Sequence, residues 1–252
     1  MNTRKLLLLL LAMGYLAAYG QNKPLDDSQP ENSYVSDIIE LKELDSLAYY
    51  SLKEAVNPQK ESIKAITDMA EVRRLLKGVA VWGITTDSGE AHESADGELL
   101  VKLTFRNGKV HAYGNNNDYD EQFFIAYYPQ EDILLLEGGH TTDVSYNLST
   151  GEATEDVGNP SYFVFSPSKK HRLNGHYNGQ ECSSYFIQQK DGSRYKKIVQ
   201  LDEEFENITG IWLCTIHDSF WSDDEMLNLL TSMPINNGRD TQLLYYQIVL
   251  KN

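Results

Sequence analysis

Two histidine–carboxylate pairs carry the residue types that acid–base chemistry needs. His140 precedes Asp143 by three residues, and His176 precedes Glu181 by five. A histidine and a carboxylate that meet across a turn can act as a general base and a general acid. The alternative is that these residues lie on the solvated ends of hairpins, where polar side chains are expected. We favour this alternative, because the chain has no His-Glu-x-x-His, zinc-ligand or Gly-x-Ser-x-Gly motif and no phosphate-binding loop.

The loop GNNNDYDEQ, from Gly114 to Gln122, carries oxygen ligands at alternate positions, namely Asn116, Asp118 and Asp120. Calcium-binding loops use this spacing. The loop lacks the glycine that makes the sharp turn of an EF-hand, so we interpret it as a solvated loop. We expect no metal and no other cofactor.

The chain has two cysteines, Cys182 and Cys214. In an exported protein an isolated pair of cysteines more often forms a disulfide than stays free, so we predict a bridge between them. The alternative is a nucleophilic Cys182 beside His176, but no sequence signature of a cysteine enzyme surrounds it.

Residues 1–20 have the layout of a cleaved secretory signal. Two basic residues, Arg4 and Lys5, precede the apolar run Leu6–Met13, and small residues stand before a cleavage site at Gln21. The apolar run is too short to span a bilayer, which needs about 20 apolar residues. We therefore expect a periplasmic or secreted protein without a membrane span.

Acidic residues dominate the charge of the chain. There are 22 Lys and Arg against 37 Asp and Glu, a net charge of −15, and removal of residues 1–20 takes away two basic residues and no acidic ones, which leaves −17. Such a field repels phosphate backbones, so we expect no nucleic-acid partner. A basic protein is a partner that this charge admits. Solubility alone is the other explanation.

An acidic cluster of Asp223, Asp224 and Glu225 follows Trp221. We predict that these residues form a binding face with Trp221 as an exposed aromatic anchor. Trp212 has apolar neighbours and is expected in the core.

Residues 21–35 are polar and contain two prolines, so we expect a flexible segment there. Residues 36–78 predict helices that pack on a larger β domain. The second of these helices begins at Asp68, which has Glu71 three residues later as in a capping box, and it ends near Gly78.

The first helix is predicted from an apolar periodicity. Apolar residues recur every three or four positions from Ile38 to Ala55. Ser36 or Asp37 would cap its start, and Asn57-Pro58 would end it.

Residues 79–252 predict a mainly β domain of antiparallel meanders. Apolar residues alternate from Leu99 to Phe105, and Asn107-Gly108 then supplies a hairpin turn. Further short apolar runs follow with no long amphipathic helix between them, which favours antiparallel sheets. We predict strands at Gln122–Tyr128, Asp132–Glu137, Asp143–Leu148, Ser161–Phe165, Arg172–Tyr177, Ser183–Gln189, Tyr195–Gln200, Ile208–Ile216, Met226–Leu230 and Leu243–Leu250.

Two stretches of this domain match each other over an offset of about 38 residues. Tyr128-Pro129 corresponds to Ser166-Pro167, and Gly139-His140 corresponds to Gly175-His176. The segment FSPSKK, which begins at Phe165, resembles the Ser-Pro-Asp-Gly-Lys turn of TolB-like and WD40-like β-propeller blades. The resemblance implies a scaffold of blade-like sheets that binds partners, and it implies no catalytic residue. A two-sheet β-sandwich is the alternative fold.

These observations favour an exported bacterial binding or interaction protein, such as an inhibitor or a surface-assembly component with a basic protein partner. The alternative is a secreted hydrolase that acts on an extracellular polymer. An enzyme would show a pocket in which at least two of His140, Asp143, His176 and Glu181 converge.

Overall fold

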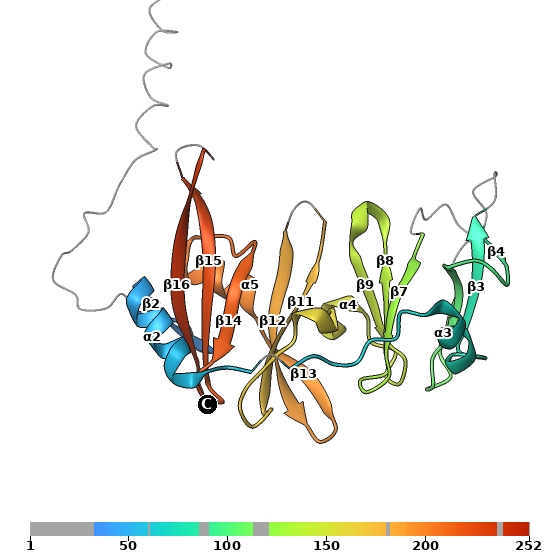
Figure 1. The fold of residues 1–252 in the computed structure, drawn as a ribbon, viewed down its shortest axis with the longest axis horizontal. Coiled ribbons are helices and arrows are strands. Elements are labelled where there is room, and N and C mark those ends of the chain that lie inside the picture. Colours follow the sequence, from blue (N-terminus) through green and yellow to red (C-terminus); the bar gives the residue numbers. More distant parts are fainter. Residues whose placement is uncertain are drawn as a thin grey trace, which may run out of the picture. The chain divides into compact units, whose positions relative to one another are not determined.

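Antiparallel pairing joins the short apolar runs into sheets, which we call A, B and C (Figure 1). The mainly β fold predicted from the sequence is confirmed. The described part of the chain forms three sheets, not the two of a sandwich. The computed structural model describes residues 33–59, 61–85, 91–112, 121–179, 182–235 and 239–251, all within the compact unit Ser33–Asn252.

Sheet A brings the two ends of the described chain together. The second strand pairs directly with the last one, and Lys251 N donates to Ile38 O at 3.0 Å beyond the end of the pairing. Residues 33–35, which we expected to belong to a flexible segment, form its outermost strand. The strand order is β1 (Ser33–Val35), β2 (Ile39–Leu44), β16 (Asp240–Leu250), β15 (Met226–Ile235) and β14 (Ile216–Trp221).

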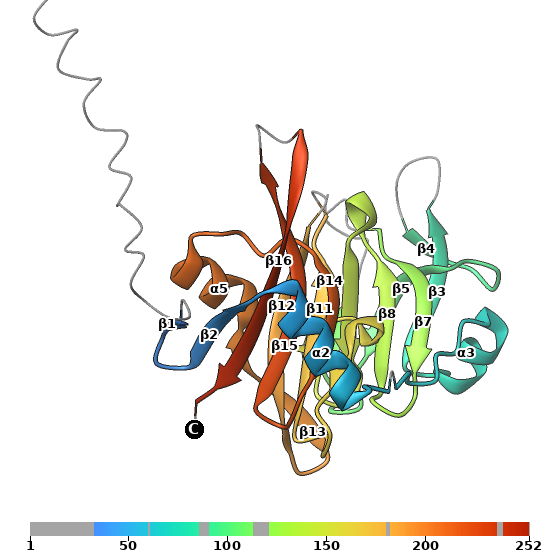
Figure 2. The ribbon, with the colours of Figure 1, turned by 60° about the vertical axis from the view of Figure 1, so that its left-hand side comes forward.

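Helix α2 (Ser46–Val56) lies over sheet A (Figure 2). Its buried Tyr49 packs there with Phe220 and Leu230. The prediction that a helix begins at Ser36 or Asp37 is wrong, because β2 occupies the first part of that periodic run.

The boundary between β2 and α2 has a physical cause. Ile39 and Leu41 are fully buried, and the backbone of β2 finds its hydrogen bonds in β16. The helix begins only where the side chain of Asp45 accepts a hydrogen bond from Ala48 N at 2.7 Å. Its end is as predicted, since Asn57 adopts a left-handed conformation with φ 47°.

Helix α3 (Met69–Leu75) confirms the predicted cap. The side chain of Asp68 accepts from Glu71 N at 2.7 Å, and Gly78 has φ +80° two residues beyond the helix cap. Within the part of the chain that the structure describes, no helix has the length and apolar character that crossing a membrane requires.

Sheet B follows α3 in the sequence. The predicted turn at Asn107-Gly108 is present: Gly108 has φ 85°, and Phe105 N donates to Lys109 O at 2.9 Å. The strand order is β4 (Ala91–Glu93), β3 (Ala80–Thr85), β5 (Leu99–Thr104), β7 (Phe123–Tyr128), β8 (Ile133–Glu137) and β9 (Asp143–Asn147), with β6 (Val110–Ala112) also paired to β5.

Sheet C is a meander whose first strand, β10, is followed by Ser166-Pro167, as β7 of sheet B is followed by Tyr128-Pro129. In both cases the next strand pairs antiparallel to the first. That these units are propeller blades stays a prediction. The strands of sheet C are β10 (Val164–Phe165), β11 (His171–Tyr177), β12 (Ser183–Asp191) and β13 (Arg194–Gln200).

The predicted strand at Ile208–Ile216 is wrong. Helix α5 (Leu201–Thr209) fills the first part of it, and β14 begins only at Ile216. Three acidic residues stand in the first turn of α5, Leu201 and Phe205 are buried one turn apart, and Gly210 ends the helix with φ 72°.

The two faces of sheet C differ in character. One face packs into an apolar core with sheet A through Leu173, Ile187 and Val199. The other face carries polar residues at the alternate positions Arg172 and Asn174 and lies against the short helix α4 (Thr154–Val157). Residues of sheet C line a cleft on each of these faces.

Candidate functional site

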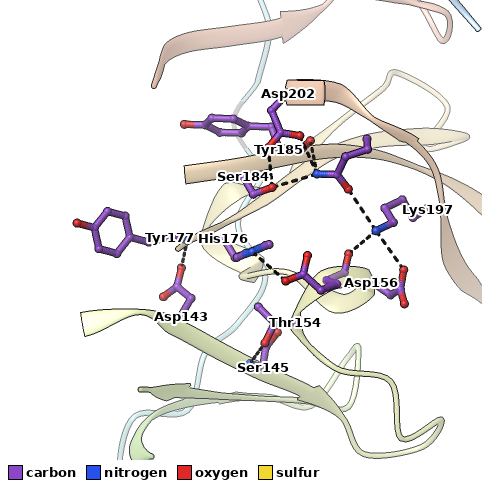
Figure 3. A network of polar contacts seen from close by, with 12 residues as sticks. Asp143, Ser145, Thr154, Asp156, His176, Tyr177, Ser184, Tyr185, Lys197 and Asp202 are labelled. Carbon is purple, nitrogen blue, oxygen red and sulfur yellow. Dashed lines mark hydrogen bonds and ion pairs between the residues drawn. The ribbon is translucent and has the colours of Figure 1, made fainter. Parts of the chain in front are cut away.

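The weak candidates for catalysis that the structure describes, His140, Asp143 and His176, do not converge on a cleft. The carboxylate of Asp143 accepts from Tyr177 N at 2.7 Å and so holds β9 to β11 (Figure 3). His140 is exposed in the turn Gly139–Thr141, whereas His176 is only 4% exposed. Glu181 lies outside the described residues. Neither of the two clefts described below is lined by these residues.

His176 belongs to a buried polar layer between sheet C and α4. Its Nε2 lies 3.8 Å from Glu155 Oε1, and its Nδ1 has no hydrogen-bond partner among the described residues. Burial lowers the pKa of His176, although nearby carboxylates act in the opposite direction. Lys197 continues the layer by donating to Glu155 O at 2.9 Å (Figure 3).

Arg172 is the charged centre of the same layer. Its guanidinium carbon lies 3.7 Å from the ring centre of Phe163 and 3.9 Å from that of Tyr195. Its Nε donates to Gln188 Oε1 at 2.7 Å, and Nη1 lies 3.2 Å from Glu131 Oε1 without an aligned hydrogen bond. Burial lowers the pKa of Arg172 to about 10, so the guanidinium stays charged at neutral pH.

A polar cleft of about 300 Å³ lies beside Arg172. Its carboxylates are largely used within the chain. Asp132 pairs with Arg106 at 2.7 Å, and Asp156 lies 3.4 Å from Lys197. The walls of this cleft are mostly polar, unlike the mostly apolar walls of a usual binding site, so we assign this region to the packing of sheets B and C.

The predicted disulfide is confirmed. Cys182 and Cys214 are bonded, with their Cα atoms 4.7 Å apart, and they join the start of β12 to the segment before β14. The calcium candidates Asn116, Asp118 and Asp120 lie outside the described residues. In the ranges that the structure covers, no group of three or more metal-ligating side chains occurs.

The predictions for two tryptophans are wrong, and in opposite directions. Trp221 is only 2% exposed: its Nε1 donates to Val164 O at 2.9 Å, and its ring stacks on His171. It therefore cannot anchor a partner from the surface. Trp212 is 57% exposed, although we expected it in the core.

The acidic cluster after Trp221 makes contacts within the chain. Asp223 Oδ1 accepts from Glu225 N at 2.8 Å, which shapes the turn between β14 and β15. Asp224 Oδ1 accepts from Ser168 N at 2.9 Å, and Glu225 lies 3.1 Å from Lys170. The turn FSPSKK thus lies against this cluster. A role for the cluster in binding a partner stays a prediction.

A larger cleft, of about 640 Å³, lies between sheets A and C. Aromatic residues form one wall, chiefly Phe165 and Tyr185 of sheet C and Tyr162 of the short 3-10 turn Pro160–Tyr162 before β10. The end strand β14 forms the other wall with residues 216–219. Residues from α2 and from the linker after it complete the cleft, among them Lys53 and Glu61.

Two carboxylates border this cleft. Asp218 Oδ2 accepts from Tyr49 Oη at 2.8 Å and from Lys53 Nζ at 2.5 Å. Glu61 lies 2.7 Å from Lys169 and is half-exposed. Burial raises the pKa of Tyr162 and of Tyr185, so both phenols are neutral at physiological pH.

Sequence reasoning missed this cleft. Its residues come from segments as distant as α2 and β14, and no local spacing connects them. The sequence offers one signal of this cleft, the aromatic run from Tyr162 to Phe165, but on its own this run predicts a strand.

Comparison of the chain with protein-family models, with curated proteins and with solved structures finds no match.

Proposed function

We propose that this protein is an exported binding protein that recognises a basic partner protein through the cleft between sheets A and C. The observation that carries the proposal is the composition of the cleft, in which neutral aromatic side chains and two carboxylates surround one concave surface. A concave, mostly apolar site with a few polar groups is the usual form of a binding site.

Lysine and arginine side chains suit such a surface. Their cationic heads are attracted to aromatic rings and to carboxylates, and their carbon stems pack on apolar walls. In the free protein Lys53 and Lys169 pair with Asp218 and Glu61. A cation of the partner would compete with these lysines. The net charge of −17 that is left after removal of residues 1–20 would attract the partner before contact.

Export is supported by two independent observations. The sequence predicts a secretory signal over residues 1–20, which lie outside the described residues. The Cys182–Cys214 disulfide is a kind of bond that persists in oxidising compartments outside the cytosol.

The first test is capture of the partner. The purified protein, immobilised, is exposed to an envelope fraction of the source cells, and bound proteins are identified by mass spectrometry. We expect a basic protein that is released at high salt, because screening weakens exposed charge pairs. If no basic protein is retained, the proposal is wrong.

The second test locates the binding site. Glu61→Lys should weaken binding of the captured partner by about tenfold, since it replaces an attractive charge in the cleft with a repulsive one. The matched control is Glu203→Lys at an exposed position of α5, which makes the same change of charge away from the cleft. Equal weakening by both variants would mean that the overall charge binds the partner and the cleft does not.

A further inference from the structure

The backbone of the cleft wall suggests how a partner lies in it. We propose that an extended segment of the partner pairs with the free edge of β14 and so adds a strand to sheet A. This inference rests on the proposed function for its ligand class, a basic protein segment. It adds the conformation of that segment and the atoms that hold it.

Among the strands that the structure describes, β14 is an end strand of sheet A and pairs only with β15. In an antiparallel sheet, alternate backbone groups of an end strand point away from its neighbour. Apart from the ladder with β15, the backbone of His217, Asp218 and Ser219 has no hydrogen-bond partner in the ranges that the structure covers. This edge therefore retains donors and acceptors for another strand.

The edge faces the cleft. The backbone N–H of Ile216 donates to Tyr185 Oη at 2.9 Å, and Tyr185 belongs to β12 of sheet C on the opposite wall. The N–H at the start of the edge thus already points across the cleft. Protein lies on both sides of this edge, so only a segment narrow enough to enter the cleft could pair with it.

The two sheets leave this part of the edge open. Strand β10 approaches β14 at the other end of β14, where Trp221 Nε1 donates to Val164 O at 2.9 Å. Residues 216–219 line the cleft, whereas Phe220 and Trp221 are buried. The ladder with β15 shifts register at a bulge between Ile216 and Asp218, so the regular part of this edge is short and suits only a short extended segment.

Charge selects the side chains of that segment. An added strand places alternate side chains on the two faces of sheet A. Asp218 lies on the face covered by α2, because its carboxylate bonds to Tyr49 and Lys53 of that helix. A segment with lysine or arginine at every second position would direct its charges towards this carboxylate.

The test uses a hexapeptide of alternating valine and lysine, acetylated and amidated, and the purified full chain. Two further versions carry N-methyl groups, one on all valines and one on all lysines. Alternate N–H groups of a strand point to opposite edges, so only one methylated set should meet β14. We expect one version to bind at least about tenfold more weakly than the parent peptide, and the other to bind within about twofold of it. Calorimetry measures both affinities.

Hydrogen exchange locates the peptide. Exchange of the amides of residues 217–219 that are not bonded to β15 should slow on binding, whereas exchange in β13, the end strand on the far side of sheet C, should not change. A peptide in which glutamate replaces lysine is the charge control and should not bind. The result that overturns the inference is equal affinity of both methylated versions, or protection of β13 in place of β14.

Failure of the inference and failure of the proposed function are distinguishable. If a captured basic protein responds to Glu61→Lys but the methylated peptides bind alike, the cleft holds side chains and β14 adds no strand. If no version of the valine–lysine peptide binds, the inference that β14 pairs with a partner strand is wrong. The capture experiment then decides by itself whether the proposed function is right.

Discussion

The guanidinium of Arg172 lies between the rings of Phe163 and Tyr195 and pairs with Glu131 of the turn before β8. A buried charge with these partners fixes how sheets B and C meet, because any shift would leave it unpaired. His176 lies on the same face of sheet C but has fewer polar partners than Arg172. Its Nδ1 has no hydrogen-bond partner among the described residues. Substitution of either residue should therefore change the stability of the folded protein.

Arg172→Lys should destabilise the protein by about 2–4 kcal/mol, because a lysine cannot stack between two rings or keep the hydrogen bond to Gln188. Urea unfolding followed by circular dichroism measures the change. Arg194→Lys is the control, since Arg194 is exposed and should change stability by less than about 0.5 kcal/mol. Similar losses in both variants would show that the enclosure of Arg172 does not matter.

The protein should lose stability as the pH falls below about 6.5, the usual pKa of histidine. Burial lowers the pKa of His176 in the folded state, so the unfolded chain takes up a proton at a higher pH than the folded chain does. His176→Gln should reduce the loss of unfolding free energy between pH 7 and pH 5, as measured by urea unfolding at each pH. His140→Gln, at an exposed site, should leave the loss unchanged. An unchanged loss in His176→Gln would show that other groups cause it.

At the scale of elements, the sequence predicted those features that depend on neighbouring residues. The cap at Asp68, the end of α2 at Asn57 and the turn at Gly108 are such features. The sequence-based prediction was wrong where the structure of a segment depends on a partner far away in the chain. The periodic run from Ile38 fits a helix face, yet its first part is a strand because β16 lies beside it.

The candidate site could not be predicted for the same reason. Burial of Trp221 depends on Val164 and His171, and exposure of Trp212 depends on the end of α5 before it. The disulfide was predictable because only two cysteines were present.

The start of α2 can be tested directly. Asp45→Ala should destabilise the protein by about 1 kcal/mol, because it removes the side-chain acceptor for Ala48 N at the cap. Asp37→Ala, at one of the two cap positions that the sequence predicts, is the matched control and should have little effect, since Asp37 is exposed. Chemical denaturation compares the two. A larger effect of Asp37→Ala would place the helix start where the sequence alone put it.

At the scale of the whole molecule, the disulfide joins sheet C to the segment that leads into sheet A across a sequence separation of 32 residues. In the chain-entropy model, closing a loop of this length stabilises the folded state by about 3–4 kcal/mol. The bond therefore supports the two sheets that form the larger cleft.

Reduction of the disulfide should lower the free energy of unfolding by about 3 kcal/mol, measured by urea unfolding with and without dithiothreitol. The double variant Cys182→Ser/Cys214→Ser should behave like the reduced protein and should not respond to dithiothreitol. An unchanged midpoint after complete reduction would contradict the expected stabilisation.

The pairing of β2 with β16 has a consequence for the order in which the chain can fold. Ile39 and Leu41 lie in β2, but their strand partner β16 is synthesised only after all the strands of sheets B and C. Sheet A therefore cannot be completed until those strands have been made. The apolar core that sheet A shares with sheet C can close only after this, so β2 must wait without its partner while the middle of the chain is synthesised.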